Sequence, residues 1–84
     1  MSAKTAYVVM IGQYPTAAAS SLEAAQADGL ASEQQYLKEG TETRWTEHRP
    51  GKEWRLMSRD ESRRRFSWTE RWVSAVPTVE GGAT

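Results

Sequence analysis

Two glutamates, Glu47 and Glu70, are the residues of this sequence that could do acid–base chemistry as a pair. If residues 41–76 form neighbouring antiparallel strands, both carboxylates flank Trp54 on one face, about 10 Å apart across two strand spacings. Glycoside hydrolases place their acid and base at a similar or slightly shorter distance. A chain of 84 residues has little room for a deep cleft, so we expect solvated carboxylates and no enzyme.

The other reactive residue types are too sparse for a catalytic or metal site. The chain has no cysteine and one histidine, His48, which excludes thiolate zinc sites, cysteine nucleophiles and disulfides. A serine nucleophile needs an oriented base beside it, and His48 is expected on a polar surface near a turn. The sequence therefore predicts neither a metal nor a cofactor, and the absence of cysteine fits a reducing, cytoplasmic location.

Arginines are the residues that most strongly suggest binding. On one face of a predicted sheet they could contact phosphates through paired hydrogen bonds, although Glu42 and Glu53 can neutralise part of the charge through cross-strand pairs. We keep three interpretations open, which are a solvated face, a protein partner and a nucleic acid. The candidate binding residues are Arg44, His48, Arg55, Arg59, Arg65 and Arg71.

Charge and aromatic placement favour a protein partner over a nucleic acid. Eleven Lys and Arg balance eleven Asp and Glu, whereas nucleic-acid-binding chains usually carry a basic excess. Sheets that bind single strands stack bases on aromatic rings, and here the tryptophans are predicted on the face away from the arginines. We expect a non-enzymatic interaction protein, with nucleic-acid binding as the alternative.

The elements that would position these residues form an α+β domain. The run Thr5–Ile11 predicts a buried N-terminal strand. Residues 16–39 predict one or two short helices, with Ser20 as N-cap and an interruption at Asp28-Gly29. We expect the N-terminal strand and the helical segment to pack on a three-stranded antiparallel meander over residues 41–76. The domain would span residues 1–78, and residues 79–84 would form a disordered tail.

Strand parity assigns the side chains of the meander to its two faces. A tight turn at Pro50-Gly51 puts Trp45 on the side of Trp54, and an odd-length turn at residues 60–64 brings the aromatics of a last strand, residues 65–76, to the same side. The predicted core face carries Trp45, Trp54, Leu56, Phe66, Trp68 and Trp72. The predicted opposite face carries Arg44, Thr46, His48, Arg55, Met57, Arg59, Arg65, Ser67, Thr69 and Arg71.

The four tryptophans are the expected source of stability. Each can bury roughly 200 Å², and a domain of this size buries only about 60–65% of its unfolded surface, so losing any one of them should be severe. Self-association would add buried surface, and a homo-oligomer is therefore a further expectation. No run of 18 apolar residues is present, so we expect no membrane span.

Two segments carry a resemblance. Near the start, an apolar strand leads into Gly12-Gln13-Tyr14 and a serine-led helix start, Ser21–Ala25, and near the end stand Phe66–Trp68 and Trp72–Pro77. Over roughly half of the chain, these segments resemble small uncharacterised proteins encoded by tailed phages of actinobacteria. The resemblance implies an accessory protein in the bacterial cytoplasm during infection, with no catalytic residues to carry over. It also implies a second strand before the helix. Residues 15–20 are too short and alanine-rich for such a strand, so we do not expect one here.

Overall fold

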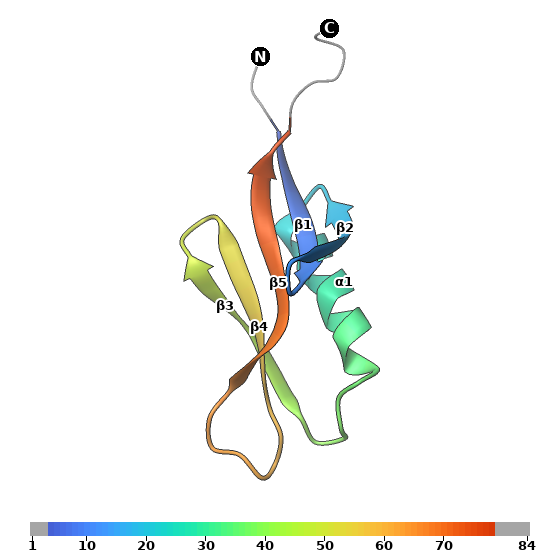
Figure 1. Ribbon diagram of the computed structural model, residues 1–84, viewed down its shortest axis with the longest axis vertical. Helices are drawn as coiled ribbons and strands as arrows, with labels where there is room; N and C mark the ends of the chain where they lie inside the picture. The colour runs from blue at the N-terminus through green and yellow to red at the C-terminus, as the bar shows by residue number, and fades with distance from the viewer. Residues whose placement is uncertain (1–3, 79–84) are drawn as a thin grey trace, which may run out of the picture.

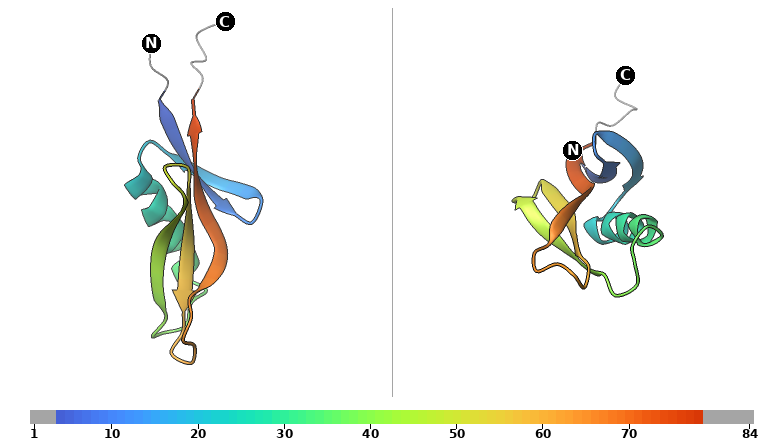
Figure 2. Two further views of the ribbon diagram at one scale, coloured as in Figure 1. Left: turned by 90° about the vertical axis from the view of Figure 1, so that its left-hand side faces the viewer. Right: turned by 60° about the horizontal axis from the view of Figure 1, so that its bottom comes forward.

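A computed structural model describes residues 4–78 as a five-stranded antiparallel sheet with one helix against one of its faces (Figures 1 and 2). The predicted α+β class is confirmed. The predicted tail, residues 79–84, and the first three residues lie outside the described part of the chain. The elements are β1 (Thr5–Ile11), β2 (Tyr14–Ala19), α1 (Leu22–Gln34), β3 (Glu42–Arg49), β4 (Glu53–Arg59) and β5 (Ser67–Pro77). The strand order is β2-β1-β5-β4-β3.

The N-terminal strands belong to the same sheet as the meander. Val9 of β1 lies opposite Val73 of β5 on one side and opposite Ala17 of β2 on the other. The prediction that β1 packs on a three-stranded meander was wrong, and so was the rejection of a second strand. Alanines suit this place, because Ala17 and Ala19 lie against the core where a larger side chain would hold α1 away.

The helix is single and continuous. Its N-cap is Ser21, whose hydroxyl accepts a hydrogen bond of 3.1 Å from the backbone N–H of Ala24, so Ser20 was the wrong cap. The predicted interruption at Asp28-Gly29 is absent, because glycine here allows close contact with the sheet. A Cβ atom on Gly29 would lie 3.1 Å from the Trp45 ring.

The core lies between α1 and the side of the sheet that faces it. Val9, Ala25 and Val73 are fully buried, and Leu56 nearly so. Trp54 joins this core, and its ring is tilted against that of Tyr7 at a centroid distance of 6.0 Å. The structure therefore confirms the predicted burial of Trp54 and Leu56.

The predicted register of the meander is correct in its first hairpin and wrong in its second. The first hairpin is as predicted, since Trp45 lies opposite Leu56. In the second hairpin Ser58 lies opposite Ser67 and Met57 opposite Trp68, which leaves an even number of residues, 59–66, between Ser58 and Ser67. Directly opposed residues point to the same face of a sheet, so the placement of Trp68 and Trp72 on the core face was wrong. The placement of Phe66 there was also wrong, because its ring contacts Arg44 and Arg59.

A bulge in β5 lies between Trp68 and Trp72 but leaves both side chains on the same face of the sheet. Trp72 lies opposite Arg55 and Trp68 opposite Met57, so Thr69–Arg71 together face Leu56. The Thr69 hydroxyl donates to the Leu56 carbonyl at 2.9 Å. Glu70 adopts a φ of 72°, and its carbonyl accepts a 2.7 Å hydrogen bond from Gly12 N–H. The two extra residues leave Trp68 and Trp72 on one face.

Replacing Glu70 by glycine should stabilise the protein by about 0.5–1 kcal/mol. A side chain costs about 1 kcal/mol or more in the left-handed region, which glycine occupies freely, and the added entropy of the unfolded chain offsets part of the gain. Urea unfolding measures the change. Ser74→Gly, elsewhere in β5 and without a positive φ, is the control and should destabilise. A loss of stability in Glu70→Gly would contradict the claim that the positive φ of Glu70 strains the backbone.

Candidate binding face

The side of the sheet away from α1, here called the outer face, gathers arginine and aromatic side chains. The register of β3, β4 and β5 places them together, because each pair of opposed residues shares a face. Within residues 4–78 no helix or strand covers this side of the sheet (Figure 2). The outer face comprises Val8, Met10, Arg44, Thr46, Arg55, Met57, Arg59, Trp68 and Trp72, with Phe66 from the loop between β4 and β5.

Three arginines of the outer face stack on its aromatic rings. The guanidinium carbon of Arg44 lies 4.2 Å from the centre of the Phe66 ring, and that of Arg59 lies 4.6 Å from the same ring. Arg55 lies 4.2 Å from the Trp68 ring. Such contacts contribute about 0.5–1 kcal/mol each at exposed sites, and they favour positions of the guanidinium groups over the rings.

The two tryptophans of the outer face are held by their indole N–H groups. Trp72 donates to the Gly12 carbonyl at 2.7 Å, and Trp68 donates to the Arg71 carbonyl at 3.3 Å. Trp68 nevertheless keeps 37% of its surface exposed. With its polar atom already satisfied, the exposed part of Trp68 is available for apolar contact.

Charge on the outer face is only partly neutralised within the described residues. Glu53 pairs with Arg55 and Glu42 with Arg59, each at 2.9 Å. Arg44 is exposed and forms no ion pair between residues 4 and 78. Arg44 is thus a cation that Phe66 positions and that no described carboxylate compensates.

The candidate residues predicted from the sequence do not all share this face. Arg44, Arg55 and Arg59 lie on it. His48 is exposed at an irregularity of β3 between Glu47 and Arg49. Arg65 is exposed in the loop before β5 rather than in the strand, because β5 begins two residues later than predicted.

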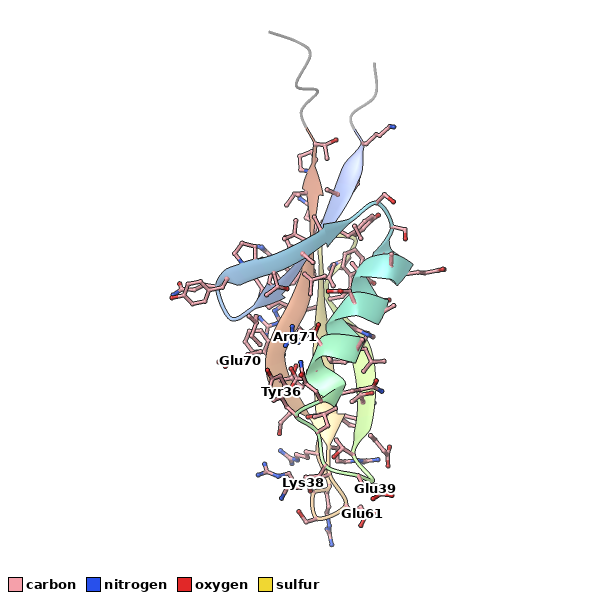
Figure 3. All side chains as sticks on the ribbon, turned by 90° about the vertical axis from the view of Figure 1, so that its right-hand side faces the viewer. Tyr36, Lys38, Glu39, Glu61, Glu70 and Arg71 are labelled. Atoms are coloured by element: carbon pink, nitrogen blue, oxygen red, sulfur yellow. The ribbon has the colours of Figure 1, made fainter. Side chains whose placement is uncertain are left out.

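Arg71 lies on the opposite side of the sheet, which corrects its predicted position. It is opposed to Ile11, and its side chain, 8% exposed, lies between β5 and α1 (Figure 3). There its Nε atom donates to Glu33 of α1 at 3.0 Å. Arg71 therefore joins the helix to the sheet and is not available for binding.

The two glutamates of the acid–base hypothesis are not arranged as predicted. Glu47 lies opposite Trp54, but the β5 residue opposite Trp54 is Val73, and Glu70 lies in the bulge further along β5. The Glu47 carboxylate also accepts a 2.9 Å hydrogen bond from Gly51 N–H. The pair that was expected to flank Trp54 is absent.

Local hydrogen bonds order the loop that carries Phe66. Asp60 accepts from the backbone N–H and the hydroxyl of Ser62 at 2.9 and 2.6 Å, and Arg59 donates to the Arg64 carbonyl at 3.2 Å. The hydrogen bond from the Ser62 hydroxyl is the main reason that the pKa of Asp60 lies below its ordinary value of 3.8. This loop conformation places Phe66 against Arg44 and Arg59.

A titration should detect this ordering. In Ser62→Ala the pKa of Asp60 should rise toward 3.8, because the strongest hydrogen bond to the charged form is lost. Since the folded-state pKa is lowered, the stabilisation is present above 3.8 and is lost as the pH falls through the folded-state value. NMR of the carboxyl carbon in both proteins measures the pKa. Equal titration curves would show that Ser62 does not hold the loop.

The described residues hold neither a cluster of metal ligands nor a helix that could span a membrane. Between residues 4 and 78 no three His, Cys, Asp or Glu side chains are grouped as metal ligands would be. In the same part of the chain, no helix has the length and apolar character needed to cross a bilayer. No protein family model, no curated protein and no solved structure matches this chain. The geometry of the outer face is therefore the basis for a functional proposal.

Proposed function

We propose that this protein is a non-enzymatic interaction protein that binds another protein through its outer face. The observation that carries the proposal is the set of arginines stacked on Phe66 and Trp68, on a side of the sheet that no described element covers. Tryptophan and arginine dominate the energetically important positions of protein interfaces, and methionine is enriched there. The outer face combines all three residue types.

Pre-positioned side chains favour tight binding on such a surface. A free arginine loses rotamer entropy when it is fixed in an interface, at about 0.5–1.5 kcal/mol per side chain. Arg44, Arg55 and Arg59 are already held against rings, so part of this cost is met in the folded monomer. Their guanidinium groups suit the paired hydrogen bonds that carboxylates accept, and an acidic partner surface fits best.

Nucleic acid is the alternative, and one observation favours it more than the sequence did. Phe66, Trp68 and Trp72 lie beside the arginines, as aromatic residues do on single-strand-binding sheets. Against it, the flanking guanidinium groups already occupy faces of Phe66 and Trp68 on which bases would stack. Glu42 and Glu53 also neutralise two of the three arginines. We therefore favour a protein.

Site-specific photo-crosslinking tests the proposal. A photoreactive amino acid at Met57, opposite Trp68 on the outer face, should capture a protein from an actinobacterial lysate. The same amino acid at Glu23, exposed in the first turn of α1, is the matched control and should not. Given the resemblance to actinobacterial phage proteins, the partner is expected among phage or host proteins of the cytoplasm.

The variant Arg55→Glu separates specific capture from background. Its fold should remain intact, because Arg55 lies on the surface of the sheet, while capture at Met57 should be lost. Capture that is nuclease-sensitive and weakens steeply with salt would assign the face to nucleic acid instead. A crosslink to a second copy of the chain would indicate a homo-oligomer, and equal capture from Met57 and Glu23 would contradict a binding face.

A further inference from the structure

The free edge of the sheet at β3 adjoins the outer face and differs from the edge at β2. β3 and β2 are the two outermost strands (Figure 1), and an outermost strand presents unpaired backbone N–H and C=O groups. In β2, Pro15 lacks an N–H, and the pairing with β1 is irregular between Val9 and Met10. Both features weaken β2 as a template for another strand.

β3 keeps a longer regular template. Its eight residues contain no proline, and its pairing with β4 is regular from Glu42 to Glu47, with an irregularity only between Glu47 and Arg49. Charged side chains on β3 protect the edge against indiscriminate pairing with apolar strands. The edge is therefore open to a strand whose side chains match those charges.

The side chains of β3 define what such a strand must carry. On the outer face Arg44 is exposed, positioned by Phe66, and unpaired within residues 4–78. On the other face Trp45 is half-buried against Gly29 of α1. Side chains directly opposite each other on adjacent strands have Cβ atoms about 4.5–5.5 Å apart, so a neighbouring strand would present one residue to each of these two groups.

We infer that the partner docks by adding an extended segment to the free edge of β3, with an acidic residue opposite Arg44 and an apolar residue opposite Trp45. This inference rests on the proposed protein-binding function and specifies the chemistry of its partner. Backbone hydrogen bonds supply affinity in this mode of recognition, and alternate side chains supply specificity. The expected segment is extended and carries an acidic residue opposite Arg44 but none opposite Glu42, because like charges directly opposite each other are destabilising.

Peptide titration followed by NMR tests the inference. The probe is a peptide of eight residues, the length of β3, in which valine alternates with threonine except for one glutamate placed to lie opposite Arg44, and it is added to the full chain. Amide exchange should slow for β3 residues whose N–H groups do not bond to β4. A peptide with lysine in place of glutamate tests charge, and one with N-methylated amides on its pairing edge tests backbone pairing. Both should bind at least about tenfold more weakly.

Reversing the charge at Arg44 tests directly whether this residue selects an acidic peptide. Arg44→Glu should weaken the glutamate peptide by at least about tenfold and reverse the preference toward the lysine peptide. Arg65→Glu makes the same change of net charge in the loop and should leave the preference unchanged. Binding that tolerates N-methylation, or protection of β2 rather than β3, would overturn the inference. If the protein with its natural Arg55 and Trp68 gave no specific crosslink from Met57, the proposed function itself would be overturned, so the two failures are distinguishable.

Discussion

Replacing Glu33 by alanine should destabilise the protein by about 3 kcal/mol, because it leaves the guanidinium of Arg71 buried without a counter-charge. The two side chains are 13% and 8% exposed and lie 3.0 Å apart. Removing one partner of such a pair costs about 3–5 kcal/mol, and residual exposure places this pair at the lower end. For a domain of this size the midpoint of thermal unfolding should fall by roughly 12–24 °C.

Glu42→Ala is the matched control for Glu33→Ala. Glu42 makes an ion pair of similar length with Arg59, but its side chain is 64% exposed, so its loss should cost about 0.5 kcal/mol or less. The double variant Glu33→Leu with Arg71→Met should recover most of the stability, because two apolar side chains can fill the same space. Equal costs for Glu33→Ala and Glu42→Ala, in urea unfolding, would show that the link between α1 and β5 is not a buried pair.

Short-range patterns in the sequence predict the α+β class and one of the two hairpins. The Pro50-Gly51 turn fixes the register of Trp45 against Leu56, because a short turn leaves few ways to pair the strands that flank it. The apolar run of β1 likewise predicts a strand with neighbours on both sides, but its predicted burial was wrong, because Val9 alone in β1 is buried. What the run cannot predict is the neighbour of that strand, since pairing with β5 joins residues sixty or more positions apart.

The second hairpin shows where parity fails. Residues 59–66 are mostly arginine, acid and serine, a composition that marks a loop but does not fix its length. Shifting one residue between loop and strand sends every following side chain to the other face. The hydrogen bonds that decide the length, from Ser62 to Asp60 and from Arg59 to Arg64, are particular to the folded loop.

The same shift changes the functional interpretation. With the tryptophans of β5 in the core, the arginines would stand alone on a polar surface, and a solvated face would be the simplest interpretation. With Trp68 and Phe66 beside Arg44 and Arg55, the same arginines form an amphipathic surface. The alternation of polar and aromatic residues over residues 65–72 is compatible with either face of the sheet, and the length of the preceding loop decides between the two.

Trp54→Ala and Trp68→Ala should therefore have very different costs, although the sequence treats both residues as core. Trp54 is 9% exposed and packs beside Val9, Ala25 and Val73, so truncation should cost about 3–5 kcal/mol through lost burial and a cavity. Trp68 is 37% exposed on the outer face. Its truncation removes the stack with Arg55, a cross-strand contact with Met57 and the indole hydrogen bond to the Arg71 carbonyl, at about 2 kcal/mol in total.

Urea unfolding of the two variants, followed by far-ultraviolet circular dichroism, measures both costs without relying on the altered fluorophores. Binding adds an independent readout, because Trp68→Ala should abolish crosslinking from Met57 while the chain stays folded. A buried role for Trp68 would instead lower stability as much as the loss of Trp54. That result would return the β5 tryptophans to the helix side and remove the aromatic half of the outer face.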